Sequence, residues 1–469
     1  MFESISNIVR VSDLRKRVLF TLFILFVYRI GSHVPTPGIN TSLLKQWFTQ
    51  HSGTLLGYLD MFSGGNFSQM TVFALGIMPY ITASIILELM TVVWPYLEKL
   101  QKEGELGRRK ITQYTRYLTI ILSIFQSLGI AFTLMKSSTG GSGFVMHPGL
   151  GFILMTVLTL TTGSAFVMWL GEQITERGVG NGMSLIIFAG IVVGLPRAVT
   201  DLWNKVQTSA WGPFTVPATL LLLAVMIAVV AFIVFVERSE RRVPVQYAKR
   251  VVGRKLMGGQ STHLPIRVNS GGVMPVIFAA SILTFPQTLS LLPAVKNSPF
   301  FGPFFASLGY GRPLYTLVYV VSIIFFAYFY VSIIFNPTEV ADNMRKYGGF
   351  IPGIRPGKRT AEYLNDILTR ITLVGGIYLV LVSLLPQFLI SGLQLQRLPS
   401  FLGGNLFASL PVWMLNGLGV NFYFGGTSLL IVVGVAMDTV QQVEAQLIMR
   451  HYEGFTARSR IRGRRTNWA

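Results

Sequence analysis

Long apolar runs separated by short polar segments recur along the whole chain. Most runs are long enough to cross a bilayer as a helix, which takes about 20 residues. The pattern indicates an all-α polytopic membrane protein. Ten spans are predicted, at Val18–Ile30, Thr71–Trp94, Tyr117–Met135, Gly151–Leu170, Met183–Trp203, Thr215–Val236, Gly272–Ala294, Leu314–Phe335, Thr372–Leu393 and Phe422–Val443.

A polar interruption precedes the second span. Residues 59–70 carry a few apolar side chains broken by Ser63, Gly64, Gly65 and Asn66. The segment is too short to span, and it can enter the membrane only where protein or water shields its backbone. It predicts either a re-entrant half-helix that feeds span two, or a plain loop before an ordinary helix, since Gly and Pro are common in membrane spans.

Two short motifs recur at an offset of five spans. Gly76–Ile81 in span two reads GIMPYI, and Gly272–Ile277 in span seven reads GVMPVI. Gly182–Ile187 in span five reads GMSLII, and Gly426–Ile431 in span ten reads GTSLLI. The paired spans run in opposite directions in a ten-span topology, which predicts two inverted halves. These halves are residues 1–209 and 210–469.

The repeat makes Ile81 equivalent to Ile277 and Ile187 equivalent to Ile431. Four isoleucines could therefore meet at a similar depth around a central axis. Such a group is either ordinary core packing or, in a pore, a hydrophobic constriction that gates by excluding water.

Composition and charge support a membrane protein and set its orientation. The chain of 469 residues is 51% hydrophobic and only 12% charged, against about 25% charged residues in soluble domains. Its net charge is +20. Lys and Arg concentrate in the N-terminal segment, the loops after spans two, six and eight, and the tail, so both termini are predicted to be cytoplasmic. The absence of cysteine excludes disulfides.

Two of the basic loops are too long to be simple connectors. In residues 237–270, apolar and polar positions alternate on two arms, which predicts a β-hairpin off the membrane. Residues 336–370 contain a short predicted helix and then a Gly- and Pro-rich turn, which is expected to be irregular throughout and to expose Arg355. Thr360 is predicted to cap the next helix. Positive-inside topology and attraction to anionic lipid explain basic loops in general. A stiff hairpin and a braced Arg355 favour docking to an acidic or phosphate-rich partner.

The chemistry of a pump or an enzyme is missing from the sequence. Ionisable groups at mid-membrane mark coupled transport, yet Glu88 and Asp438 lie towards cytoplasmic ends of spans, as expected for satisfied structural charges. No phosphate-binding loop, nucleophile–base grouping or metal-ligand spacing occurs. We therefore expect a passive conduit without a cofactor, and not an enzyme.

At this point long stretches resemble the SecY family of protein-conducting channels. They are FALGIMPYITASII, GEQITERGVGNGMSLIIFAGI, VPVQYAKR with QSTHLPIRVN, GGFIPGIRPG and FYFGGTSLLIVVGVAMDT. The resemblance covers nearly the whole chain. It implies a clamshell of two five-helix halves around an hourglass pore in the cytoplasmic membrane. Unfolded, signal-bearing polypeptides would cross through it, and membrane segments would leave sideways.

The resemblance also assigns residues to parts of such a channel. The pore ring falls on Ile77, Ile81, Ile187, Ile277 and Ile431. A plug helix at about residues 59–70 includes Met61, Phe62, Ser63, Gly64, Gly65, Asn66 and Phe67. The lateral gate, between spans two and three and spans seven and eight, includes Thr82, Ser84, Gln126, Ser127 and Ser281. Partner docking falls on Lys249, Arg250, Arg254, Arg355 and Lys358.

The implied partners supply the driving force and complete the assembly. The SecA motor or the ribosome would dock on the cytoplasmic loops, SecE would clamp the back of the clamshell, and SecG would be peripheral. YidC and SecDF are further candidates. Two positions depart from the family pattern: Glu88 stands where Gln is familiar, and Met183 where isoleucine often lies near the ring.

Two other function classes compete with a protein channel. A secondary transporter of small solutes shares the ten spans and the inverted repeat, but it predicts a polar site at mid-membrane. A lipid-handling membrane enzyme would need a catalytic grouping, which the sequence lacks.

Overall fold

The computed structural model describes residues 11–50, 60, 63–137, 143–208, 215–247, 250–252, 255–257, 261–289, 308, 312–391 and 426–458. A helix lies over each of the ten predicted spans. These helices are α2 (Ser12–Gly31), α5 (Met78–Val93), α7 (Glu105–Ser137), α8 (Leu150–Arg177), α9 (Gly182–Val193), α11 (Thr215–Arg238), α12 (Met274–Leu289), α15 (Pro313–Ile334), α17 (Lys358–Ser391) and α19 (Gly426–Arg458).

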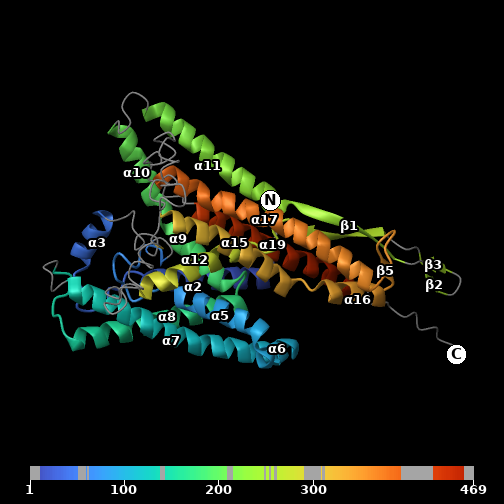
Figure 1. Cartoon of the computed structure of the whole chain (residues 1–469), viewed down its shortest axis with the longest axis horizontal. Helices are drawn as coiled ribbons and strands as arrows, with labels where there is room; N and C mark the ends of the chain where they lie inside the picture. Colours follow the sequence, from blue (N-terminus) through green and yellow to red (C-terminus); the bar gives the residue numbers. More distant parts are fainter. Residues whose placement is uncertain are drawn as a thin grey trace, which may run out of the picture.

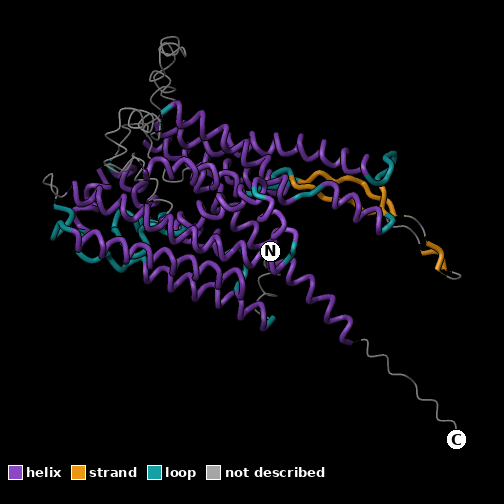
Figure 2. Tube along the Cα trace, turned by 60° about the horizontal axis from the view of Figure 1, so that its bottom comes forward, coloured by secondary structure: helices purple, strands orange, loops and turns teal. Residues whose placement is uncertain are grey.

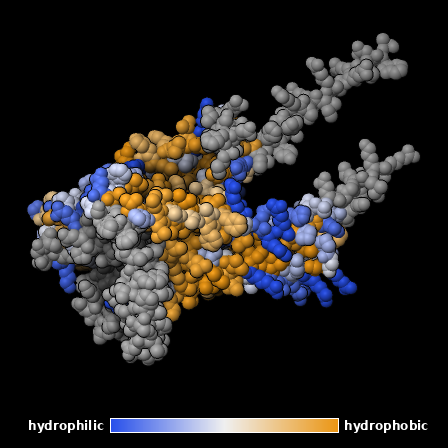
Figure 3. All heavy atoms as spheres, turned by 90° about the horizontal axis from the view of Figure 1, so that it is seen from above, coloured by the Kyte–Doolittle hydropathy of each residue, from blue (hydrophilic) through white to orange (hydrophobic). Residues whose placement is uncertain are grey.

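The long helices lie side by side as a bundle (Figure 1), and apolar side chains form a belt across its middle (Figure 3). Within the described residues, six helices are long and apolar enough to cross a membrane. A seventh span results if α5 and α6 (Pro95–Lys102), which are bent by 99° relative to each other, count as one. The chain is therefore a mostly helical, multi-pass membrane protein.

The helices pack as two groups. In one group α7 packs between α5 and α8, and α8 also contacts α2 and α9. In the other group α15 packs between α12 and α17, and α19 contacts α11 and α17. The main contacts between the groups are those of α12 with α5 and α7, and of α19 with α9. The helices that carry the repeated motifs, α5, α9, α12 and α19, thus all take part in the contact between the two groups, together with α7.

The predicted second span begins later than its apolar run. Residues 71–77 form a bridge and turns, and α5 begins only at Met78. Gly76 has φ of +55°, and Gly272 has φ of +57° before α12 begins at Met274. A left-handed residue cannot continue a right-handed helix, and glycine adopts it without steric cost. The first repeated motif therefore produces the same backbone turn twice.

The predicted fifth span, Met183–Trp203, is wrong as one helix. It is divided into α9 and a second helix, α10 (Leu195–Gln207), after Gly194. Pro196 lies in the first turn of α10, where its missing N–H costs nothing. Proline favours a new helix start there over an uninterrupted helix.

The predicted plug helix is also wrong for residues 64–70. Asp60 and Ser63 are helical, but residues 64–70 form turns. Gly64, Gly65 and Met70 all have positive φ, at +73°, +83° and +43°. Side chains replace the helical hydrogen bonds: Asp60 Oδ1 accepts from the Ser68 N–H at 2.6 Å, and Ser63 Oγ accepts from the Phe67 N–H at 3.1 Å. Met61 and Phe62 lie outside the described residues.

The predicted hairpin is confirmed: its long strands lie beside the ends of the helices, and its tip extends beyond them (Figure 2). Strand β1 (Glu240–Tyr247) pairs antiparallel with β4 (Ser261–Arg267), with Val243 opposite Leu264. The tip carries a second, two-stranded sheet of β2 (Arg250–Val252) and β3 (Lys255–Met257).

The Gly- and Pro-rich turn is not irregular throughout, contrary to the prediction. Strand β5 (Gly349–Phe350) pairs with the other edge of β1, which gives the order β4-β1-β5. Gly349 permits this pairing because the Tyr247 ring would lie 3.0 Å from any Cβ at that position. The Tyr247 ring covers this backbone. Tyr247 is partly exposed, although it occupies the same alternating positions of β1 as the buried Val243 and Val245.

A separate hydrophobic cluster fixes the hairpin and the turn to the bundle. Helix α16 (Pro337–Lys346) occupies the place of the predicted short helix. The cluster joins the sheet, α16, the turn, and the adjoining ends of α15 and α17. Its buried members are Val243, Val245, Ile266, Val331, Met344, Ile351, Leu364 and Leu368.

Candidate functional site

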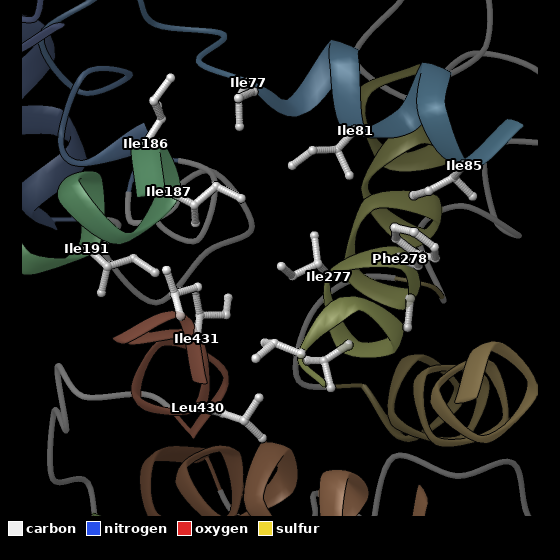
Figure 4. Packing of buried hydrophobic residues seen from close by; sticks show 14 of the residues in the cluster. Ile77, Ile81, Ile85, Ile186, Ile187, Ile191, Ile277, Phe278, Leu430 and Ile431 are labelled. Atoms are coloured by element: carbon white, nitrogen blue, oxygen red, sulfur yellow. The ribbon is translucent and has the colours of Figure 1, made fainter. Parts of the chain in front are cut away.

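Five isoleucines meet where the two helix groups meet. Ile77 at the start of α5, Ile81 one turn later, Ile187 of α9, Ile277 of α12 and Ile431 of α19 belong to one buried cluster, and none is more than 6% exposed. Their side chains point towards a common centre (Figure 4). The sequence repeat predicted that four of these residues would meet, and the structure brings all five together.

The repeated motifs position these side chains in matching ways. The glycine turn and the proline fix where α5 and α12 begin, so Ile81 and Ile277 lie one turn into each helix. Helices α9 and α19 both begin at the glycine of the second motif. Asn181 caps α9, its Oδ1 accepting from the Met183 N–H at 3.1 Å. The first turns of four helices therefore place aliphatic side chains around one point.

Met183, whose place relative to the ring the sequence left open, packs against the same cluster from the side of α8. Its sulfur lies against Gly171 of α8, where a Cβ would come within 2.4 Å of it. Met183 is therefore a contact between α9 and α8, and Ile187, one turn later, is the α9 residue among the five.

Residues 63–70, here named the plug segment, lie against α9, which carries Ile187, and against α2, α3, α7 and α8. Gly64 approaches Gly190 of α9 so closely that a Cβ on Gly64 would lie 2.7 Å from the Gly190 Cα. Phe67 and Met70 are buried in a second apolar cluster with residues of α3 (Thr41–Gln50), α7 and α8. Backbone bonds fix the end of the segment, because Met70 O accepts from Thr36 N–H at 2.8 Å.

The expected lateral-gate residues belong to α5, α7 and α12, and α12 contacts both other helices. Thr82 Oγ1 donates to Met78 O at 3.0 Å, and Ser127 Oγ to Ile124 O at 2.9 Å, so both hydroxyls bond within their own helices. Ser281 Oγ is buried without a hydrogen-bond partner among the described residues. Ser84 and Gln126 are half-buried. Apolar residues of α5 and α12, among them Ile85 and Phe278, belong to one buried cluster at this contact.

The expected docking residues are only partly described. Arg355 and Lys358 are exposed on the turn before α17. Thr360 does not cap α17, which begins two residues earlier; its Oγ1 instead donates to the Arg355 carbonyl at 2.9 Å. Arg250 lies in β2, with only its backbone described, and Lys249 and Arg254 lie outside the described residues.

Sequence reasoning missed a polar network at the ends of α11, α12 and α19. Asn269 Nδ2 donates to Glu237 Oε1 at 2.7 Å and to Gly272 O at 3.0 Å. Asp438 lies 3.9 Å from Arg267 Nη1, as expected of a satisfied charge. Glu88 differs from that expectation, because its Oε2 is buried without a hydrogen-bond partner within the described ranges. No acidic, His or Cys grouping in the described part of the chain could hold a metal ion.

The family model described as SecY matches residues 71–440, which include all five isoleucines and both long basic loops. The chain belongs to the SecY family. It is 46% identical over 452 residues to the protein translocase subunit SecY of Escherichia coli strain K12, covering 96% of each chain. It is 47% identical over 465 residues to the same subunit of Streptomyces galbus, covering 97% of this chain and all of that one.

Solved structures share the SecY fold with this chain. A structure titled as that of a protein-conducting channel matches with a TM-score of 0.60 over 92% of this chain and 91% of the other, at 16% identity. Sec61 in a canine ribosome–channel complex matches with a TM-score of 0.58 over the same shares. At these identities the likeness shows the fold alone.

Family membership decides among the function classes. This SecY-family chain is a protein-conducting channel that translocates proteins across the membrane. It is a non-enzymatic pore, so the lipid-handling enzyme and the small-solute transporter are wrong. It is a multi-pass protein of the cytoplasmic membrane.

Proposed function

We propose that Ile77, Ile81, Ile187, Ile277 and Ile431 form the constriction through which an unfolded polypeptide passes. The observation that carries this is their convergence from four helices of two groups onto one centre (Figure 4). A resting hole wide enough for a chain would leak ions. Apolar side chains exclude hydrated ions, yet they deform around a passing peptide without selecting its sequence.

The two helix groups are then inverted halves of a ten-span clamshell. The matching glycine turns before α5 and α12, and the matching starts of α9 and α19, support this symmetry. The halves are residues 1–209 and 210–469, and both termini are cytoplasmic. The plug segment closes the resting channel from its seat beside the ring helices.

Membrane segments of the substrate leave sideways between α5 and α7 on one side and α12 and α15 on the other. This gate is supported by the buried apolar residues at its contact, whose packing lipid tails or an apolar signal sequence could replace at little cost. Buried Ser281 and the helix-bonded Thr82 and Ser127 would face the passing segment.

The hairpin and the turn with Arg355 dock the machinery that drives transport. Arg355 and Lys358 are exposed, and the turn is fixed by Ile351 and by the Thr360 hydroxyl. Such rigid cations suit an acidic or phosphate-rich surface, as the SecA motor and the ribosome would provide. SecE and SecG complete the channel, with anionic lipids around it and YidC and SecDF as further partners.

Crosslinking to a stalled chain tests the constriction. A photoreactive residue replaces Ile81, Ile277 or, as the control, Leu22, which is 56% exposed on the outside of α2. A ribosome-stalled, signal-bearing chain should crosslink from positions 81 and 277 and not from position 22. Equal crosslinking from all three positions, or crosslinking from position 22 alone, would refute the proposed path.

A further inference from the structure

Tyr28 of α2 makes an unusual connection between a spanning helix and the plug segment. Its side chain is buried. Its hydroxyl accepts a hydrogen bond from Asn66 Nδ2 at 3.3 Å and donates to the Ser63 carbonyl at 3.5 Å. Both partners belong to the plug segment, so a single phenol satisfies two of its buried polar groups.

The aromatic ring of Tyr28 is held in place without its hydroxyl. The ring stacks on Phe73, with centroids 5.7 Å apart and planes at 3°. Phe73 is itself confined, because a Cβ on Gly31 would lie 2.1 Å from its Cε2. Phe73 also stacks on Phe166 of α8 at 6.0 Å. Loss of the Tyr28 hydroxyl would therefore leave the packing of the ring unchanged.

A second contact holds the plug segment against α9. Gly64 lies against Gly190 of α9, three residues after Ile187 of the proposed ring. Gly64 has φ of +73°, so a side chain at this position is strained as well as obstructed. The segment thus contacts both α2 and α9.

Both seats lie in the N-terminal half. Among the described residues, the hydrogen bonds of residues 63–70 all end within that half. Separation of the two halves would therefore leave these bonds intact, and displacement of the plug segment must break them as a distinct step.

We propose that Tyr28 is a positioning residue that holds the plug segment in its closed seat through Asn66 and the Ser63 carbonyl. This inference rests on the proposed function, because it assumes that the segment closes the pore. One buried hydrogen bond shifts such an equilibrium about fivefold. Tyr28 would thus set how readily the segment leaves its seat when a substrate enters.

The test removes the hydroxyl and keeps the ring. Tyr28→Phe should raise the ion leak of the resting, reconstituted channel about fivefold, matching the shift expected for one hydrogen bond. The matched control is Tyr378→Phe in α17, because the Tyr378 hydroxyl is equally buried but has no hydrogen-bond partner in the described part of the chain. The control should leak as little as the original chain.

A labelling experiment reports the position of the segment directly. The chain has no cysteine, so Ser68→Cys supplies a single thiol on the buried plug segment. A membrane-impermeant maleimide should label this thiol faster when Tyr28→Phe is added, and not when Tyr378→Phe is added. Unchanged leak and labelling in Tyr28→Phe would overturn the inference.

A double-mutant cycle separates the hydrogen bond from general loosening. Asn66→Ala should raise the leak as Tyr28→Phe does, and the two together should leak less than the product of the single effects, because each removes the same bond. Full multiplicativity would count against a direct bond. The original chain must translocate a signal-bearing substrate in the same vesicles. If the original chain fails to translocate this substrate, the proposed function is refuted. If transport is normal but Tyr28→Phe does not change the ion leak, only the positioning role of Tyr28 is refuted.

Discussion

Arg116 Nε in α7 lies 2.8 Å from Glu172 Oε1 in α8. The pair joins the helix that borders the proposed gate to the next helix of the same half. Its side chains are 45% and 11% exposed. The carboxylate is therefore largely withdrawn from solvent and depends on its partner, whereas the guanidinium is partly screened.

We expect Glu172→Gln to destabilise the protein by about 1 kcal/mol, because it removes the charge that a half-exposed arginine pairs with. Thermal unfolding in detergent measures this as a lowered Tm. The matched control is Glu105→Gln, since the Arg109–Glu105 pair is 75% and 83% exposed and should contribute almost nothing. Equal shifts in Tm for the two variants would show that the Arg116–Glu172 pair has no special role.

Replacing Ile81 or Ile277 with Ser should make the closed channel leak ions. A hydroxyl at the constriction lets water persist where an apolar ring excludes it. Ion conductance of reconstituted channels measures the effect. Ile323→Ser in α15 is the control, because Ile323 is fully buried in the same cluster but does not belong to the five. Ile323→Ser should lower the Tm without raising the ion leak. If both Ile81→Ser and Ile277→Ser leak no more than the original chain, these residues do not form the constriction.

The sequence could predict this ring because the repeat carries geometric information. Equivalent motifs in oppositely directed spans place Ile81, Ile187, Ile277 and Ile431 at similar depths before any contact is known. The alternation in residues 237–270 likewise predicted β1 and β4, since a half-buried strand requires period two. In both cases a local pattern determined the result.

The errors arose where tertiary contacts or single backbone angles decide. Apolarity extended span two over residues 71–77, although Gly76 prevents a helix there. Strand β5 depends on an edge of β1 that lies about 100 residues away along the chain. No local sequence pattern indicated the role of Tyr28, because a tyrosine in an apolar span is common. Only the fold shows that Asn66 lies beside it.

Arg355→Glu should block transport that is driven by the motor or the ribosome while leaving assembly intact. The side chain is exposed, so its loss disturbs no packing, and the reversed charge repels an acidic partner. In vitro translocation and size-exclusion chromatography of the complex measure the two effects. Arg359→Glu, also exposed and close along the chain, is the control. Normal secretion by the Arg355 variant would refute docking at this turn.

Thr360→Val should reproduce part of that defect without changing any charge. The Thr360 hydroxyl donates to the Arg355 carbonyl at 2.9 Å and fixes the turn. Losing it leaves the carbonyl to water and should cost about 1 kcal/mol of local stability. Hydrogen exchange at the amides of residues 353–355 should quicken, and motor-driven transport should fall moderately. Thr369→Val is the control, because the Thr369 hydroxyl donates only to Asn365 O within α17.

Ser281→Ala should make the gate harder to open. The Ser281 hydroxyl is buried in α12 without a hydrogen-bond partner among the described residues, so the closed state contains an unsatisfied group. Removing it should stabilise the closed contact by about 1 kcal/mol. Weakly hydrophobic signal sequences should then be transported less, and strongly hydrophobic ones as before. Ser127→Ala is the matched control, because its hydroxyl already bonds to Ile124 O. An equal response of both variants to signal hydrophobicity would refute the role of Ser281, since only Ser281 differs in being unsatisfied when the gate is closed.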